Sequence, residues 1–322
     1  MDQLLALDKE DIRTGINSFV HDLSAQKQSG LAWVKGHIKE INEWVDRDGV
    51  ALLRGLNIVS TNQFSTILET IFQEPLAQYI YRSSPRTALR NNIYTTTEYH
   101  ADQVILQHNE NAYSNCWPMR MGFFCVVPAK TGGNTPLADS RAVYRQLPVA
   151  LRDKFERLGV MYVRNYGEID LPWQEVFQTQ NKADVEAYCW KNDIIFEWKS
   201  DNHLQTRQIR PAVATHPKTG EKVWFNQAHL FHCSSIDNQL PESMRESIGM
   251  DNLPRNAYFG DGSDIDASDI ATINEVYQSL TFAYQWQRND IMLLDNMLYT
   301  HGREAYTGTR KVLVGMAKAA YG

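Results

Sequence analysis

The first hundred residues carry the hydrophobic pattern of amphipathic helices. Between residues 34 and 45, four apolar side chains recur at intervals of four, three and four residues, which predicts a helix with one buried face. The sequence DRDG at 46–49 ends this helix, and VALLRGL after it is typical of a buried strand. Ser60 and Gln63 form a capping-box pair, which predicts a second helix directly after them.

Short apolar runs replace this pattern from about residue 103 onwards. The runs are bounded by polar or turn residues and predict strands at QVILQ, MGFFCVV, GVMYVRNYG, IIFEW, LQTRQIRPAVATH, KVWFN, NDIMLLDN and RKVLVGMA. TGGNTP and PKTG predict turns. Helices are expected at 140–158, 171–191 and 268–280. We therefore expect a mainly β fold with flanking helices, a β-sandwich or jelly roll, in a single domain over 1–322 with a helix-rich lead-in over 1–100.

Composition and charge exclude several classes of protein. The 322 residues are 43% hydrophobic and 22% charged, which is ordinary for a globular protein. The net charge is −6 and no Lys/Arg-rich run occurs, so we expect no nucleic-acid partner. No apolar stretch approaches the ~20 residues of a membrane span, and the acidic N-terminus does not resemble a signal peptide. Four scattered cysteines without a CxxC pattern indicate reduced thiols, and together these features predict a cytoplasmic protein.

Two pairs of histidine and carboxylate are candidates for metal binding. His100 with Asp102, and His108 with Glu110, are each separated by one residue, so in a strand both members of a pair would point to one face. Chance alone gives roughly one such pair in a chain of this composition. The two pairs cannot share an ion in one continuous strand, because eight extended residues span about 26 Å. The second pair is favoured, since His108 follows the apolar run VIL, whereas His100 lies in a polar stretch.

His301 is the best third ligand that the sequence offers. It follows the predicted strand IMLLD and is expected to open the polar turn HGREAYTGT, after which Arg310 begins another apolar strand. His229 and His232 compete with it, but no carboxylate has a suitable spacing to them. Two histidines and one carboxylate on one face of an octahedron leave three positions open, the arrangement of non-haem Fe(II) oxygenases.

Three separated segments then resemble one family. LQHNENAYSNCWPMRMGFFCVVPAKTGGNTPLADSR, KVWFNQAHLFH and LLDNMLYTHGREAYTGTRKVLVGMA are similar, in this order, to segments of Fe(II)/2-oxoglutarate-dependent dioxygenases of the taurine dioxygenase (TauD/TfdA) family. The glutamate of HNE and the WP that follows it resemble the clavaminate synthase-like branch and the amino-acid hydroxylases of natural-product pathways. The resemblance implies a double-stranded β-helix core, and Fe(II), 2-oxoglutarate and O₂ as cofactor and cosubstrates.

The resemblance also implies roles for five residues. His108, Glu110 and His301 match the iron ligands, Arg310 matches the arginine that pairs with the distal carboxylate of 2-oxoglutarate, and Thr135 matches the threonine that helps to hold it. A guanidinium fork suits a carboxylate and stays charged. Halogenating relatives lack the carboxylate ligand, so Glu110 argues against halogenation. The matched motifs also contain polar residues to which we assign no role: Arg120, Asn226 and Arg303.

The expected reaction is hydroxylation of an unactivated C–H bond, with release of succinate and CO₂. By analogy the substrate is an amino acid or an amino-acid-derived unit, free or tethered to an acyl or peptidyl carrier protein. Residues 168–200 are long enough to form a lid. Three alternatives stay open at this point: a desaturase or epoxidase with the same cofactors, a jelly-roll binding protein without enzymatic activity, and a zinc hydrolase with the same ligands.

Overall fold

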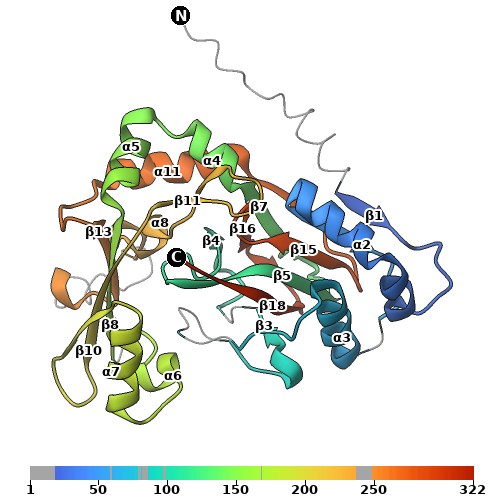
Figure 1. The fold of residues 1–322 in the computed structure, drawn as a ribbon, viewed down its shortest axis with the longest axis horizontal. Coiled ribbons are helices and arrows are strands. Elements are labelled where there is room, and N and C mark those ends of the chain that lie inside the picture. The colour runs from blue at the N-terminus through green and yellow to red at the C-terminus, as the bar shows by residue number, and fades with distance from the viewer. Residues whose placement is uncertain are drawn as a thin grey trace, which may run out of the picture.

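Two facing β-sheets form the centre of the molecule in the computed structural model (Figure 1). The structure describes residues 19–58, 60–78, 81, 86–96, 99–167, 169–236 and 249–322. The larger sheet has six strands in the order β1-β2-β15-β5-β18-β3, and the smaller has four in the order β14-β7-β16-β4. All neighbouring strands in both sheets are antiparallel except β1 and β2.

The predicted apolar runs coincide with five strands of the two sheets, β2, β4, β5, β15 and β18, and the other five strands were not predicted. In the larger sheet the strands are β1 Val20–Asp22, β2 Val50–Arg54, β3 Tyr94–Thr95, β5 Cys116–Val127, β15 Ile291–Asp295 and β18 Lys311–Tyr321. In the smaller sheet they are β4 Ile105–His108, β7 Thr135–Asp139, β14 Phe282–Tyr284 and β16 Tyr299–Arg303. Two further sheets have only two short strands each. They pair β6 Thr131–Gly132 with β17 Tyr306–Thr307, and β11 Val213–Thr215 with β12 Lys222–Trp224.

Alternation along each strand divides the apolar residues between two cores. In β15, Leu293 packs toward the helices, while Met292 and Leu294 face the smaller sheet. The inner core between the sheets also holds Phe123 of β5 and Leu137 of β7. Because successive strand residues point to opposite faces, a continuous apolar run such as IMLLD is the pattern of a strand buried on both sides.

Helices α2 (Gly30–Asp48) and α3 (Thr61–Phe72) cover the outer face of the larger sheet. Their ends follow the predicted signals. Gly49 ends α2 in the left-handed conformation at φ 80°, and the side chain of Ser60 accepts a hydrogen bond from the backbone N–H of Gln63 at the start of α3. Both helices of the lead-in are therefore confirmed.

A third apolar core lies beyond the smaller sheet. It packs helices and a four-stranded sheet of order β13-β8-β10-β9 against Ala138 of β7. The strands are β8 Val160–Tyr166, β9 Ile195–Trp198, β10 Leu204–Arg210 and β13 Arg255–Phe259. The helices of this region are α4 Ser140–Gln146, α5 Val149–Leu158, α6 Trp173–Phe177, α7 Lys182–Lys191, α8 Ala228–Phe231, α9 Cys233–Ile236 and α11 Ala267–Leu280, and two 3₁₀ turns, η1 Arg90–Asn92 and η2 Met250–Asn252, complete the described elements.

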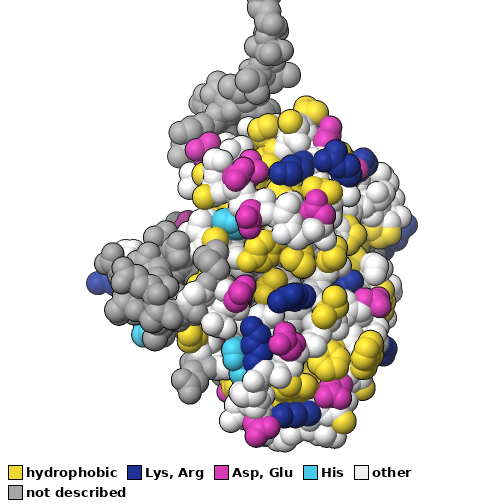
Figure 2. Space-filling model, turned by 90° about the vertical axis from the view of Figure 1, so that its left-hand side faces the viewer, with side chains coloured by type: hydrophobic (Ala, Val, Ile, Leu, Met, Phe, Trp, Pro, Cys, Tyr) yellow, Lys and Arg dark blue, Asp and Glu magenta, His cyan; other side chains and the backbone are white. Residues whose placement is uncertain are grey.

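The outer face of this third sheet is solvent-exposed. Ile195 and Ile209 on it are 70% and 51% exposed. Arg207, the register partner of Ile195 and two residues before Ile209 in β10, is also exposed. Figure 2 shows hydrophobic side chains interspersed with charges of both signs on this side of the molecule. Scattered apolar residues of this kind are normal on protein surfaces.

The strand expected over LQTRQIRPAVATH is divided between β10 and β11, and three further local predictions were wrong. The helix expected over 140–158 is divided, because Leu147 is extended before Pro148 (φ −60°, ψ 141°) and a residue that precedes proline avoids the helical region. His301 does not open a turn but lies inside β16, which extends to Arg303. Glu110 does not share a strand with His108, since β4 ends at His108 and Glu110 belongs to the following turn.

Candidate metal centre

The structure brings His108, Glu110 and His301 together. Their potential ligand atoms all lie within 4.8 Å of one another, the one such group of three or more His, Cys, Asp or Glu found among the described residues. The two histidines face each other across β4 and β16, where they are register partners with ring centroids 4.5 Å apart. His301 Nε2 lies 3.6 Å from Glu110 Oε2. Two ligand atoms that each lie about 2.0–2.2 Å from one ion can be 3.6 Å apart.

A buried asparagine fixes the main chain of Glu110. The amide of Asn296 accepts a hydrogen bond from Glu110 N at 2.7 Å, and donates to Glu110 O and to Pro118 O, both at 2.9 Å. The carbonyl of Asn296 accepts a further bond from the side chain of Asn109 at 2.7 Å. Asn296 is 0% exposed, so these bonds are shielded from water. The turn after β4 is thereby held against the turn after β15.

The ring of His108 is arranged as a neutral ligand. His108 Nδ1 lies 2.9 Å from the carbonyl of Leu106, which can only accept, so Nδ1 carries the proton and Nε2 keeps its lone pair. Burial, together with the neighbouring His301, lowers the pKa of His108 to about 3. The buried Nδ1 of His301 has no hydrogen-bond partner among the described residues. This donor set of two imidazole nitrogens and one carboxylate fits a divalent transition metal.

Glu110 is paired with an arginine that the sequence analysis did not identify. Arg86 Nη2 donates to Glu110 Oε2 at 2.6 Å, and the two side chains are 4% and 2% exposed. Burial alone would raise the pKa of Glu110, but the charge of Arg86 and the contacts to both histidines outweigh it and hold the pKa well below its usual range. Glu110 is therefore an ionised carboxylate, the form that binds a metal.

Thr135 shares the face of the smaller sheet on which His301 lies. Leu137 is the register partner of His301, and Thr135 is two residues before it in β7, so all three side chains point the same way. Thr135 is 3% exposed, and its hydroxyl accepts a hydrogen bond from Trp286 Nε1 at 3.2 Å. Thr135 therefore lies on the same face of the sheet as His301, and its role in holding the cosubstrate stays a prediction.

Arg310 reaches the same segment from the start of β18. Its Nε donates to the carbonyl of Gly133 at 2.7 Å, and Nη1 lies 3.3 Å from Thr96 Oγ1. Desolvation and the nearby Arg303 lower the pKa of Arg310 to about 10, so the guanidinium stays charged at neutral pH. A partly desolvated cation of this kind favours an anionic ligand.

The glycine pair in TGGNTP allows this approach. Gly132 and Gly133 have φ of 63° and 70°, a conformation that side chains rarely adopt. A Cβ on Gly132 would lie 2.2 Å from the carbonyl oxygen of Ala305, and one on Gly133 would lie 3.0 Å from Cδ of Arg310. The turn therefore needs glycine to bring Arg310 close to β7.

The competing histidines have structural contacts instead. His229 Nε2 lies 2.8 Å from the carbonyl of Gln107, and His232 Nε2 lies 2.9 Å from that of Ile265. His100 is exposed and belongs to no metal-binding group among the described residues. Of the pairs weighed from sequence, only the one containing His108 lies at the centre.

The three unassigned polar residues are also accounted for by structure. Arg303 donates to three carbonyls of the loop at 99–103. The side chain of Asn226 bonds to Ala212 O and Ala228 N. Arg120 forms ion pairs with Asp46 and Asp295. Each holds backbone or charge in place.

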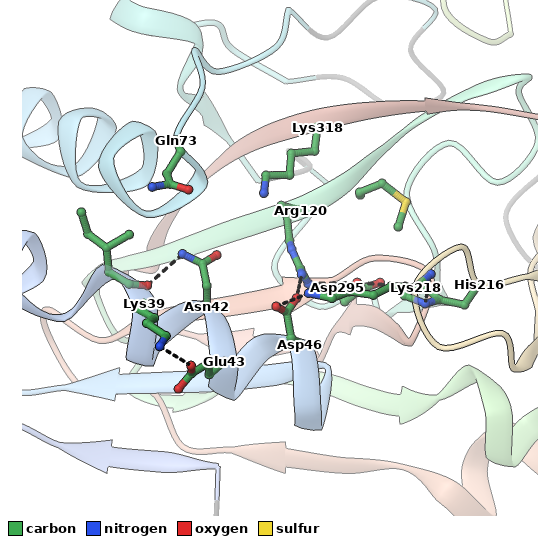
Figure 3. A pocket seen from close by; sticks show the side chains of 12 residues that line it. Lys39, Asn42, Glu43, Asp46, Gln73, Arg120, His216, Lys218, Asp295 and Lys318 are labelled. Atoms are coloured by element: carbon green, nitrogen blue, oxygen red, sulfur yellow. Dashed lines mark hydrogen bonds and ion pairs between the residues drawn. The ribbon is translucent and has the colours of Figure 1, made fainter.

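A large cavity lies on the opposite face of the six-stranded sheet. It has a volume of about 610 Å³ and is bounded by α2 and by the ends of β5, β15 and β18 (Figure 3). Several charged side chains around it pair with one another, as Arg120 does with Asp46 and Lys39 with Glu43. None of the candidate ligands, nor Thr135 or Arg310, lines this cavity.

A jelly-roll core whose smaller sheet carries two histidines beside a turn carboxylate defines the class of non-haem metal oxygenases. A family model agrees: residues 23–317 match the taurine catabolism dioxygenase TauD, TfdA family. The chain belongs to this family of Fe(II)/2-oxoglutarate-dependent dioxygenases, and the predicted enzyme class, cofactors and double-stranded β-helix core are confirmed.

Two relatives and two solved structures extend this finding. The chain is 37% identical to the dapdiamide synthesis protein DdaC of Enterobacter agglomerans, covering 87% of this chain and 85% of that protein. It is 28% identical to a clavaminate synthase-like protein of Arabidopsis thaliana, covering 86% and 84%. The fold is similar to PvcB of Pseudomonas aeruginosa (TM-score 0.53, 14% identity, 92% and 84% covered) and to AAD-2 in complex with Mn(II) and N-oxalylglycine (TM-score 0.53, 14% identity, 93% of both chains).

Proposed function

We propose that this chain hydroxylates an unactivated C–H bond of an amino acid or an amino-acid-derived substrate, using Fe(II), 2-oxoglutarate and O₂. The observation that carries the proposal is the convergence of His108, Glu110 and His301 within 4.8 Å. In this proposal the three residues are the iron ligands, and Arg310 and Thr135 hold the distal carboxylate of 2-oxoglutarate. When bound, iron with its cosubstrate and O₂ supplies the oxidising chemistry, and succinate and CO₂ are released.

The protein's own part is orientation and the exclusion of water. His108 offers Nε2 because its Nδ1–H is held by Leu106 O. Glu110 offers an ionised oxygen, since the charge of Arg86 holds its pKa low, and its main chain is fixed by Asn296. Three protein ligands on one face leave adjacent positions for a chelating cosubstrate and for oxygen, which a closed tetrahedral site would not. A charged guanidinium at Arg310 suits a dicarboxylate better than a neutral cosubstrate.

The substrate class rests on similarity. The likeness to a dapdiamide synthesis protein and to a clavaminate synthase-like protein supports a role in natural-product biosynthesis with an amino-acid-like substrate, free or on a carrier protein. A lid over 168–200 remains a prediction; aromatic residues of α6 and α7 pack on Tyr81, so an opening of this segment would break contacts such as Tyr81–Phe177. No helix in the described part of the chain is long and apolar enough to cross a membrane, and a cytoplasmic location and a single domain also remain predictions.

A substrate screen tests the proposal. Free and carrier-bound amino acids are incubated with Fe(II), 2-oxoglutarate and O₂, and succinate and product mass are measured. Hydroxylation adds one oxygen atom and desaturation removes two hydrogens, so mass distinguishes these outcomes. Glu110→Ala should abolish turnover while the circular dichroism spectrum stays unchanged. Full turnover in Glu110→Ala, or product formation without O₂, would refute the proposal.

A further inference from the structure

The ion pair between Arg86 and Glu110 joins two distant parts of the fold. Arg86 lies 24 residues before Glu110, yet its Nη2 is 2.6 Å from Glu110 Oε2. Both side chains are almost fully buried, at 4% and 2% exposure. A buried ion pair of this kind is seldom a gain in stability, because both charges lose their hydration. The role of this ion pair therefore lies in its effect on Glu110.

Arg86 is presented by a structured segment rather than by a free loop. The backbone N–H of the next residue, Thr87, donates to Thr95 Oγ1 at 2.9 Å, and Thr95 N donates to Thr87 O at 3.0 Å. Thr95 belongs to β3 and is the register partner of Leu313 in β18. The guanidinium thus extends from an edge of the six-stranded sheet, a rigid support for a positioning group.

Glu110 needs a second hold on its side chain. Asn296 fixes the main chain of Glu110 on both N and O, but three rotatable bonds separate that main chain from the carboxylate. An aspartate ligand would have one bond fewer to order. Each free rotor of a long side chain costs entropy when it is fixed, so an unsupported glutamate would be a poorly preorganised ligand.

We propose that Arg86 is the positioning residue of Glu110, binding its Oε2 so that the carboxylate faces His301 before any metal arrives. This inference rests on the proposed function and adds to it a residue outside the three ligands. Partners of metal ligands typically contribute a factor of about 10–100 in metal affinity. The guanidinium is suited to this task because its donors have a fixed planar geometry, which a lysine lacks.

Metal affinity of the full-length apoprotein tests the inference without any turnover. Co(II) is titrated into the wild type and Arg86→Met, with calorimetry and visible absorption as readouts. We expect Arg86→Met to bind Co(II) about 10–100-fold more weakly. Arg54→Met is the matched control, since Arg54 likewise pairs with a buried carboxylate, that of Asp290, on the larger sheet away from the three ligands. Its Co(II) affinity should match that of the wild type.

Equal Co(II) affinity in the wild type and a folded Arg86→Met would overturn the inference. If Arg86→Met does not fold, Arg86→Ala is titrated with and without guanidinium ion at tens of millimolar, against ammonium at equal ionic strength. If guanidinium, but not ammonium, raises the Co(II) affinity of Arg86→Ala about tenfold, positioning by Arg86 is supported. An unchanged Co(II) affinity rejects it. His301→Ala separates the two proposals: if this variant binds Co(II) normally, the proposed metal site itself is wrong.

Discussion

Asn296→Ala should weaken both the fold and the metal centre. The asparagine amide makes three hydrogen bonds, to Glu110 N, Glu110 O and Pro118 O, at 2.7–2.9 Å. Alanine removes all three bonds and leaves these backbone groups without that partner. The site is closed to water, since Asn296 is 0% exposed. The bond from Asn109 to the carbonyl at position 296 remains, because it involves only the main chain.

The expected loss of stability is about 4 kcal/mol. Each of the three bonds contributes about 1 kcal/mol net, and the backbone groups left without a partner add a desolvation cost of about 1 kcal/mol or more. A domain has about 5–15 kcal/mol of stability, so the variant should still fold. The turn that carries Glu110 would then lose its register against β15, and the metal affinity should fall by about 10–100-fold.

Urea denaturation of the apoprotein and Co(II) titration measure the two effects. Asn226→Ala is the control, because Asn226 is equally buried and also bonds to backbone, at Ala212 O and Ala228 N. It should lose about 2–3 kcal/mol for its two bonds but keep its Co(II) affinity. The reasoning is refuted if Asn296→Ala loses less than about 1 kcal/mol, or if both variants lose metal affinity equally.

Two further predictions concern the cosubstrate and pH. Arg310→Gln should raise the KM for 2-oxoglutarate about 100-fold, the equivalent of one or two charge-assisted hydrogen bonds. The KM for substrate should stay nearly unchanged. An unaltered dependence on 2-oxoglutarate would remove Arg310 from that pocket. Burial lowers the pKa of His229 to about 4, so between pH 6.5 and 4 the unfolded state binds the extra proton and the apoprotein loses stability as pH falls. His229→Gln should reduce that slope by about 1.4 kcal/mol per pH unit, measured by urea denaturation at several pH values, and an identical slope would contradict a neutral buried His229.

Much of the fold followed from local patterns. The helical period over 34–45, the cap at Ser60 and the apolar runs around residues 121–127 and 291–294 depend on neighbours in sequence, and the structure has elements at each. Such signals survive because tertiary contacts reinforce them. The break before Pro148 was also readable from sequence, since proline restricts the residue before it, but one helix was predicted through it.

The supports of the site could not be predicted in the same way. Arg86 and Asn296 lie 24 and 186 residues from Glu110, and neither stands in a pattern that marks it as a partner of that residue. Arginines and asparagines of this kind are common in any chain. Only the folded path of β3 and the turn after β15 shows that one holds the carboxylate and the other the backbone.

The register of the smaller sheet connects the core with the chemistry. Leu137 is buried between the sheets, and its register partner is His301, which in turn pairs with His108. A slip of β16 by one residue would turn His301 to the opposite face and expose the apolar set of the strand to the wrong core. The burial of Leu137 and Tyr299 therefore selects the same pairing that turns His301 toward Glu110. For this reason the two histidines need few hydrogen bonds of their own, whereas Glu110, which lies beyond the end of β4, depends on Asn296 and Arg86.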